Sequence, residues 1–435
     1  MKYNNPITVA LAFCLLAAAV QAQSPVDTRE HIFDEAVRTL KVAPASNPYL
    51  PSIYVMGSND CIEVNFDYLD YELHYLRYSV THCDANWQPS VLVESEYVDG
   101  FNYADIEDYE QSNATFTHYY NYNFRIPNDN LRITKSGNYL LSVYEQDDPE
   151  RILFQTRFSV SENRVGVAPA VTSATDWDYN GHHQQVSFTV NYKPGTITDP
   201  YNELTAVVSQ NTRTDNQVML TRPMMVSGNS VSYESMNELI FNAGNEYRRF
   251  EHVNINSLNM GVAAIQYFEP FYHATLYLDE PRAESQYLYD STQHGHFTIR
   301  NAQSTRSRCE ADYVVTHFML NTGEKLLGGR VILEGEFTHG LPIDEYTMRW
   351  DENDGCYRAD LLLKQGAYNY QYLWLPDGAF QARTSNIEGD HYQTANEYTI
   401  MVYDRPMGER YDHLVEHAVV HFNERATRRL SPSRS

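Results

Sequence analysis

Hydrophobic and polar residues alternate along many short stretches of this chain. In the run Cys61–Tyr68, the apolar side chains of Ile62, Val64 and Phe66 are separated by charged or amide side chains. A period of two places successive side chains on opposite faces of an extended strand, so this pattern predicts a half-buried β-strand. Further strands are predicted at Tyr75–Val80, Asn138–Tyr144, Gln155–Val160, Val186–Tyr192, Leu204–Gln210, Val218–Thr221, Glu246–Phe250, Ala274–Leu278, His296–Arg300, Asp312–Leu320, Arg330–Phe337 and Glu397–Tyr403. The chain is therefore predicted to be all-β.

The spacing of these strands indicates three modules. Short strands separated by turn signals such as Asp354-Gly355 are typical of antiparallel immunoglobulin-like β-sandwiches. We assign residues 23–162 to an N-terminal sandwich, 163–303 to a second and 304–408 to a third. A chain of 435 residues also suggests about three domains, at about 150 residues each. The strand Glu397–Tyr403 is expected to close the third sandwich.

The last segment, residues 409–435, is predicted to form a short helix followed by a basic tail. On such a helix His413, His417 and His421 would form one stripe, and two histidines at this spacing can share a metal ion. The zinc-protease motif His-Glu-x-x-His is not present, because Ala418 stands where it needs glutamate. A polar helix face explains the stripe better, and no metal site is assigned.

The first 22 residues read as an export signal. Lys2 supplies the positive charge, Val9–Val20 is an apolar run, and cleavage is expected after Ala22. Cys14 is not expected to carry a lipid, because Phe13 is bulky where a lipoprotein signal needs a small residue. No later segment approaches about 18 uninterrupted apolar residues, so no membrane-spanning helix is predicted.

Composition narrows the classes of partner. The formal net charge of −25 argues against nucleic acid or anionic lipid as the main partner, since both attract clustered Lys and Arg. The 35 tyrosines suit strands with one face packed and one face wet. Tyrosine is also enriched at protein interfaces, so a protein partner fits this composition.

Four cysteines follow the export signal: Cys61, Cys83, Cys309 and Cys356. None lies in a Cys-x-x-Cys pair, which argues against zinc or thioredoxin-like chemistry. An exported compartment permits disulfides. Cys61 and Cys83 would face each other if their strands formed a hairpin turning near residues 70–72, and Cys309–Cys356 is the second predicted pair.

No motif of an enzyme is found. The chain has no Gly-x-Ser-x-Gly elbow, phosphate loop or dinucleotide fingerprint. The run Asp351–Gly355 resembles part of a calcium loop but lacks the glycine and the distal glutamate that such a loop needs, so a hairpin turn is predicted. We predict no catalytic residue, cofactor or small-molecule substrate. A hydrolase with a carboxylate pair stays open, because sequence does not give carboxylate separations.

The third module resembles the early-set immunoglobulin-like modules that include glycogen-binding domains. The resemblance rests on Val331–Phe337 and Tyr357–Tyr372. Such domains stack sugar rings on exposed aromatic side chains, and Trp350 and Trp374 could serve in this way. Trp374 lies in an apolar run, so core packing is expected for it. A periplasmic carbohydrate-binding protein is therefore the alternative function.

Several longer stretches together resemble one family, the plug protein of the bacterial type IX secretion system. They span the exported chain in order: His82–Ser90, Glu96–Phe101, Lys135–Leu141, Gly244–Phe250, Ala311–Tyr313, Gly389–Tyr398 and Tyr403–Leu414. The chain departs from the expected pattern at Gln293-His294-Gly295, where Asp or Asn is expected before the glycine.

The resemblance implies a periplasmic protein without catalytic residues. Members of this family dock on the periplasmic mouth of a giant outer-membrane β-barrel translocon and close its pore when no substrate is in transit. The expected location is the periplasmic side of the outer membrane, reached through the export signal and held by the translocon. No nucleic acid and no direct membrane insertion are expected.

Overall fold

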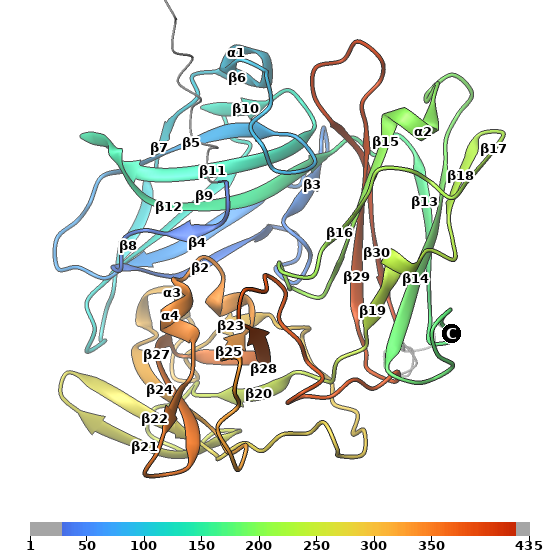
Figure 1. Ribbon diagram of the computed structural model, residues 1–435. Helices are drawn as coiled ribbons and strands as arrows, with labels where there is room; N and C mark the ends of the chain where they lie inside the picture. Colours follow the sequence, from blue (N-terminus) through green and yellow to red (C-terminus); the bar gives the residue numbers. More distant parts are fainter. Residues whose placement is uncertain (1–27, 423–435) are drawn as a thin grey trace, which may run out of the picture.

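The computed structural model describes residues 28–422. The predicted export signal and the basic end of the chain lie outside these residues. The prediction of an all-β protein is confirmed, because strands dominate the described part and form three lobes (Figure 1). The α-helices there have four residues each: α1 Glu94–Tyr97, α2 Pro200–Glu203, α3 Ser307–Glu310 and α4 Ile343–Tyr346. No helix within residues 28–422 has the length and apolar character to cross a membrane.

The first sandwich packs two main sheets face to face. One sheet has the order β1-β12-β11-β5-β7, with β3 beside β12, and the other has the order β2-β4-β9-β8. The strands are β1 His31–Ile32, β2 Val37–Pro44, β3 Ile53–Val55, β4 Ile62–Tyr68, β5 Leu76–Cys83, β7 Ala104–Asp105, β8 Asp108–Gln111, β9 Tyr120–Ile126, β11 Gly137–Glu145 and β12 Asp148–Ser161. A small ribbon of β6 Val98–Gly100 and β10 Leu131–Ile133 adjoins them.

The alternation of apolar and polar residues that predicted strand β4 agrees with the burial of its apolar side chains in the first sandwich. Ile62, Val64 and Phe66 are each 0% exposed, and Phe66 stacks on Tyr122 of β9 with ring centroids 5.2 Å apart. Burial of one apolar face on each sheet is the main favourable contribution to such a fold.

The second sandwich also has two sheets, but it draws strands from two distant parts of the chain. One sheet runs β13-β14-β18-β17 with β19 beside β14, and the other runs β16-β15-β29-β30. The strands are β13 Gly166–Thr172, β14 His183–Asn191, β15 Leu204–Gln210, β16 Val218–Leu220, β17 Met225–Ser227, β18 Ser230–Tyr233, β19 Ile240–Asn242, β29 Glu397–Asp404 and β30 His413–His421. A short 3-10 helix, η1 Asn237–Leu239, precedes β19.

Strand β29 belongs to this second sandwich, so its assignment to the third was wrong. It pairs with the whole length of β15, from Leu204 opposite Asp404 to Gln210 opposite Tyr398. Ile400 and Val402 are fully buried in the core of the second sandwich. Alternation identified the strand and its buried face, but a strand's pattern does not name its neighbour.

The predicted C-terminal helix is also wrong where the structure describes it. Residues 413–421 form strand β30, which pairs antiparallel with β29. The segment contains Val415, Val419 and Val420, and β-branched side chains favour strands. Leu414 and Val415 are fully buried. A nine-residue pattern of apolar and polar residues is compatible with a helix or with a strand. Pairing with β29 stabilises the strand.

The third sandwich is inserted between β19 and β29. Its sheets are β20-β28-β23 with β25 beside β28, and β21-β22-β24-β27-β26. The strands are β20 Arg248–Glu251, β21 Val262–Phe268, β22 Phe271–Leu276, β23 Phe297–Ile299, β24 Tyr313–Leu320, β25 Gly329–Glu334, β26 Arg349–Asp351, β27 Cys356–Lys364 and β28 Gly366–Pro376. Strands β20, β22 and β23 had been predicted in the second module. The 3-10 helix η2 Glu336–Thr338 follows β25.

All four described cysteines are free in the structure, so neither predicted disulfide is formed in it. The hairpin expected to bring Cys61 and Cys83 together does not exist, because β4 and β5 lie in different sheets of the first sandwich. Cys309 instead donates its thiol to Glu110 Oε2 at 3.1 Å.

Candidate functional site

The three sandwiches contact one another through buried side chains. We call the region where they meet the junction, and it contains the buried and paired charged residues described below. A small apolar cluster joins the first sandwich to the second. It consists of Ile53, Ala85, Val207, Tyr403 and Leu414. Charged side chains from different sandwiches also meet, and the pair Asp67–Lys364 between the first and the third is fully buried. We therefore take the junction as the candidate functional site.

A buried ion pair links the first sandwich to the third. Asp67 lies in β4 and Lys364 ends β27, and their side chains are 0% and 1% exposed. Lys364 Nζ lies 2.6 Å from Asp67 Oδ2. Tyr313 donates its hydroxyl to the same oxygen at 2.6 Å, and Asn121 donates to Oδ1 at 2.7 Å. Every oxygen of this carboxylate is therefore hydrogen-bonded, as a buried charge requires.

The ammonium group of Lys364 also has several partners. It donates to the carbonyl of Arg308 at 2.6 Å and lies 4.1 Å from the centroid of the Tyr119 ring. Burial lowers the pKa of Lys364, and the negative charge of Asp67 opposes this shift. These contacts come from β4, β9, β24, β27 and the segment around α3, so they specify how the two sandwiches face each other.

A second ionic contact joins the same two sandwiches beside β23. Lys41 of β2 lies 2.5 Å from Glu336 Oε2, and His296 Nδ1 lies 3.1 Å from the same oxygen. Lys41 also donates to the carbonyl of Phe297 at 3.1 Å. Burial raises the pKa of Glu336, but Lys41 and His296 outweigh it and lower that pKa to about 2. Glu336 is therefore ionised at neutral pH.

The second and third sandwiches are joined by two chain segments that run side by side. The outgoing segment donates from Gly244 N to Asp390 Oδ1 at 3.0 Å, and the return segment donates from His391 N to Gly244 O at 2.8 Å. Asn396 Nδ2 donates to Ala243 O at 2.7 Å. Because both segments are hydrogen-bonded to each other, the connection lacks the freedom of a single linker.

Glu388 anchors this double connection. Its side chain is 0% exposed and lies 3.0 Å from Arg248 Nε and 2.6 Å from Arg282. The backbone N–H of Tyr372 donates to Glu388 Oε1 at 2.9 Å. Burial raises the pKa of Glu388, but Arg248 and Arg282 reverse this effect and lower it overall.

The C-terminal strands connect the first and second sandwiches. Asp412 accepts the N–H of Ala85 at 2.8 Å, and Arg405 lies 2.6 Å from Asp84. Tyr403 donates its hydroxyl to Asn138 Oδ1 at 2.8 Å. The Gly389–Leu414 region, which includes two of the stretches in the family resemblance, therefore contacts the first sandwich through Tyr403 and Asp412 and pairs with the second through β29.

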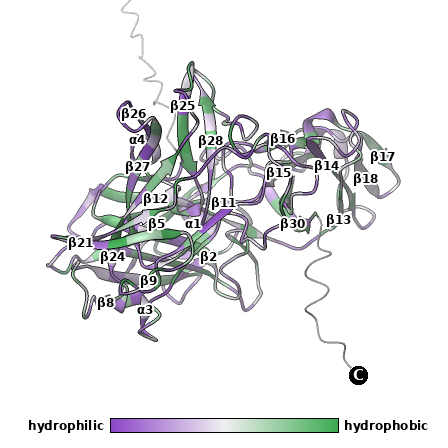
Figure 2. Ribbon diagram, turned by 90° about the horizontal axis from the view of Figure 1, so that it is seen from below, coloured by the Kyte–Doolittle hydropathy of each residue, from purple (hydrophilic) through white to green (hydrophobic). Residues whose placement is uncertain are grey.

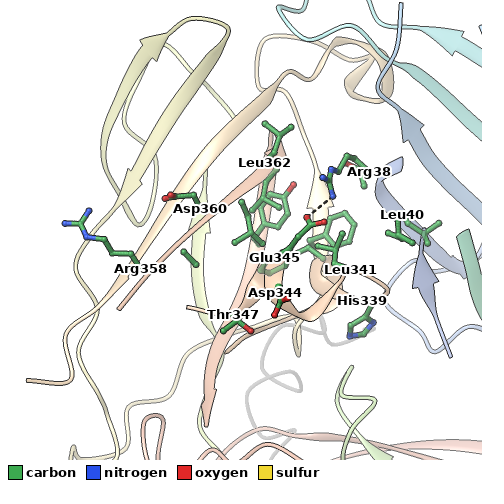
Figure 3. A pocket seen from close by; sticks show the side chains of 18 of the residues that line it. Arg38, Leu40, His339, Leu341, Asp344, Glu345, Thr347, Arg358, Asp360 and Leu362 are labelled. Atoms are coloured by element: carbon green, nitrogen blue, oxygen red, sulfur yellow. Dashed lines mark hydrogen bonds and ion pairs between the residues drawn. The ribbon is translucent and has the colours of Figure 1, made fainter. Parts of the chain in front are cut away.

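A pocket of about 420 Å³ opens between the first and third sandwiches (Figure 3). Arg38 of β2 donates to Glu345 Oε2 of α4 at 3.0 Å across it. Other charged residues of the lining are also engaged: Asp360 accepts from His317 at 2.5 Å, and Arg358 pairs with Asp354. Leu40 and Leu341 add apolar surface. We assign no catalytic role to this pocket.

The three histidines of the C-terminal stripe do not form a site. On strand β30, residues four apart lie about 13 Å from one another, too far to share one ion. His413 Nδ1 is 2.9 Å from Glu162, and His421 Nδ1 is 3.6 Å from Glu397. Within residues 28–422, no group of three or more His, Cys, Asp and Glu side chains could hold a metal ion.

The cysteine thiols are poorly suited to chemistry. Burial raises the pKa of Cys83 to about 12 and also raises the pKa of Cys61 and Cys309. A thiol that stays protonated is a weak nucleophile. Cys356 is buried at the start of β27.

The two tryptophans proposed as a sugar platform are packed. Trp374 is 7% exposed and belongs to the core of the third sandwich, as expected. Trp350 is partly buried against the same core, with its ring centroid 5.1 Å from that of Tyr357.

Sequence reasoning missed the junction residues. His296 had been predicted only as the first residue of a strand, yet its side chain is 9% exposed and lies 3.1 Å from Glu336 Oε2. One signal could have revealed the Asp67–Lys364 pair. Lys364 directly follows three leucines, whereas Asp67 occupies an ordinary polar position of the alternation in Ile62–Tyr68. A charge at such a position predicts a buried partner, but not which one.

Comparison with known proteins shows which proteins share this architecture. Residues 37–162 match the family described as the type 9 secretion system plug protein first domain. A solved structure described as a hypothetical protein from Parabacteroides merdae is 39% identical and superposes with a TM-score of 0.89, covering 91% of this chain and 99% of that one. No curated protein matches the chain. The chain therefore carries a type IX secretion system plug-like domain over residues 37–162, and it shares its architecture with the Parabacteroides merdae protein over 91% of its length.

Proposed function

We propose that this protein is a non-catalytic periplasmic plug that docks on the outer-membrane translocon of the type IX secretion system and seals its pore between transport events. One observation carries the proposal: polar contacts join the first sandwich to the third, the third to its connection with the second, and the second to the first, and the Asp67–Lys364 pair among them is fully buried. A wide pore can be sealed only by a body that keeps its shape, and the junction supplies this property.

Rigidity is not the default for tandem domains. Sandwiches connected by single linkers usually move relative to one another. Here the third sandwich is held by two hydrogen-bonded connections and by ionic contacts to the first sandwich. Buried ion pairs contribute little net stability, but they permit few alternative geometries. The junction therefore favours one arrangement of the three lobes.

Charge supports a protein partner as the anchor. At a net charge of −25 the chain is repelled by anionic headgroups, so binding to the lipid surface is not favoured. In our proposal the export signal delivers the protein to the periplasm, and the translocon holds it at the outer membrane. The carbohydrate-binding alternative loses its main support, because Trp350 and Trp374 are packed in the third sandwich.

Two measurements test the proposal. Affinity purification of the tagged full chain from detergent-solubilised outer membranes should recover a large β-barrel protein. Deletion of the gene should increase the entry of large antibiotics that normally cannot cross the outer membrane, and wild-type protein should restore the barrier. An unchanged barrier in the deletion strain would count against pore sealing, even if secretion were impaired.

A further inference from the structure

The hairpin β21–β22 projects from the third sandwich at the periphery of the molecule. In Figure 1 it lies at the lower left, away from the second sandwich, and in Figure 2 β21 again lies at the outer edge. Strand β21 is the terminal strand of a five-stranded sheet and pairs only with β22 within residues 28–422. One side of its backbone is therefore available for hydrogen bonding.

Strand β21 has few of the features that normally prevent an edge strand from pairing: a register shift between Val262 and Ala264 interrupts its start, and Ala264–Phe268 pair regularly with β22. Its seven residues, Val-Ala-Ala-Ile-Gln-Tyr-Phe, include no charged residue and no proline. Proteins usually protect an exposed edge with charges, proline or very short strands. Other edge strands of this protein have such protection, namely Pro169 in β13, Asp108 and Glu110 in β8, and Arg349 and Asp351 in β26.

The hairpin geometry identifies the available backbone groups. Phe268 and Phe271 pair across a two-residue turn, so they form a hydrogen-bonded pair. Antiparallel pairs alternate between bonded and non-bonded, and Ile265 and Tyr267 therefore direct their N–H and C=O groups outward. No described residue bonds to this outer edge.

Aromatic side chains surround the edge near the hairpin tip. Tyr267 and Phe268 are 45% and 56% exposed. Tyr267 contacts Tyr272 with ring centroids 5.1 Å apart, and Phe116 from the first sandwich contacts both rings. Exposed aromatic residues beside unpaired backbone are typical of surfaces that bind an extended peptide, because the rings bury apolar area and the backbone supplies the register.

We propose that the outer edge of β21 accepts an extended segment of the translocon as an added strand. This inference rests on the proposed function and names the mode of docking. Lipid cannot occupy the edge, since it offers no backbone groups in register. A second copy of the chain is disfavoured, because edge-to-edge pairing would bring two bodies of net charge −25 together.

The test uses two variants of the full chain that differ in one backbone N–H. Ile265→Ala and Ile265→Pro both remove the side chain, which packs on the core, but only proline removes the outward N–H. The probe is the detergent-solubilised outer-membrane fraction. We expect Ile265→Ala to recover the β-barrel and Ile265→Pro to recover at least about tenfold less.

A second pair of variants tests the proposal in case the proline variant misfolds. Ala264 and Thr275 are cross-strand partners, so Ala264→Lys places a charge on the edge strand and Thr275→Lys places the same charge one strand inward. Only Ala264→Lys should weaken recovery. Amide hydrogen exchange should also slow at residues 263–268 when the wild-type chain is in the complex.

The outcomes separate the two proposals. Equal recovery of the barrel by folded Ile265→Pro and Ile265→Ala, or by both lysine variants, overturns strand addition and leaves the plug function intact. A dimer of the isolated chain that is abolished by Ala264→Lys would assign the edge to self-association and also overturn it. Failure of the wild type to recover any large barrel overturns both proposals.

Discussion

Glu336 illustrates how single polar residues organise this molecule. It lies where the first and third sandwiches meet, and its carboxylate contacts Lys41 at 2.5 Å and His296 at 3.1 Å. The carboxylate also accepts the N–H of Phe297 at 3.2 Å. Such residues would be exposed if each sandwich existed alone, so their burial reflects the assembled molecule.

The contacts of the Glu336 carboxylate should make the free energy of unfolding depend on pH. The pKa of Glu336 is lowered from 4.5 to about 2, so its contribution is complete above pH 4.5 and is lost as the pH falls toward 2. Between pH 6 and pH 3, the free energy of unfolding of the wild type should fall by about 2 kcal/mol more than that of Glu336→Gln. Denaturant titrations at the two pH values measure this difference.

The control for this comparison is Glu63→Gln. Glu63 pairs with Arg125 at 3.1 Å on the surface, with side chains 30% and 58% exposed, and exposed pairs contribute little. Its pH dependence should match that of the wild type. A Glu336→Gln protein with the same pH profile as the wild type would show that this carboxylate titrates normally.

Individual elements are also adapted to the junction, as the start of β11 shows. Gly137 has a φ of +126°, and a Cβ placed there would lie 2.6 Å from His82 Nε2 and 3.2 Å from the carbonyl of Asp412. His82 is 1% exposed and is held by the carbonyl of Ser136 at 2.9 Å. The strand can begin at this point only because the residue has no side chain.

Replacing this glycine should therefore be costly. Gly57 also has a positive φ, +76°, but nothing lies within 4 Å of a Cβ built there. We expect Gly137→Ala to lower the free energy of unfolding by at least about 2 kcal/mol more than Gly57→Ala, because only the former adds a clash in a packed region. Denaturant unfolding of the two variants measures the difference. Equal costs would show that His82 moves aside freely.

At the scale of the whole molecule, the inserted third sandwich couples the three lobes. The chain leaves the second sandwich after Asn242 and returns to it at Glu397, so the two parts of the second sandwich are connected through the third. The Asp67–Lys364 pair then joins the third to the first. The three lobes are expected to unfold together.

Cooperative unfolding can be checked with two probes. Tryptophan fluorescence reports on all three sandwiches through Trp87, Trp177, Trp350 and Trp374, and circular dichroism reports on the strands. The two transitions should coincide in the wild type. Lys364→Met should cost about 3 kcal/mol or more, because it leaves the carboxylate of Asp67 buried without its cation.

Two further variants sharpen this test. Asp67→Asn combined with Lys364→Met should recover part of the stability, since no charge then remains unpaired. Loss of the exposed pair through Arg125→Gln should change stability by less than about 1 kcal/mol. Two well-separated transitions in the wild type would contradict a rigid junction.

The sequence by itself identified many of the strands and an apolar face on each, although it assigned His413–His421 to a helix. The period of two in Ile62–Tyr68, Leu204–Gln210 and Glu397–Asp404 reflects the strand backbone, which turns successive side chains to opposite faces whatever lies beside it. The Asp354-Gly355 turn was equally readable, because Gly355 takes the positive φ of +62° that such turns require. The family resemblance also came from the chain alone.

Tertiary structure decided how these strands are combined. The alternation in Glu397–Asp404 suits any sheet with an apolar face, and only packing placed it beside β15. His413–His421 had a periodicity compatible with a helix, and a ladder to β29 made it a strand. The junction charges depend on surfaces that touch only after each sandwich has formed. Their partners lie far away in sequence, such as Asp67 and Lys364, and local patterns hold no information about such pairs.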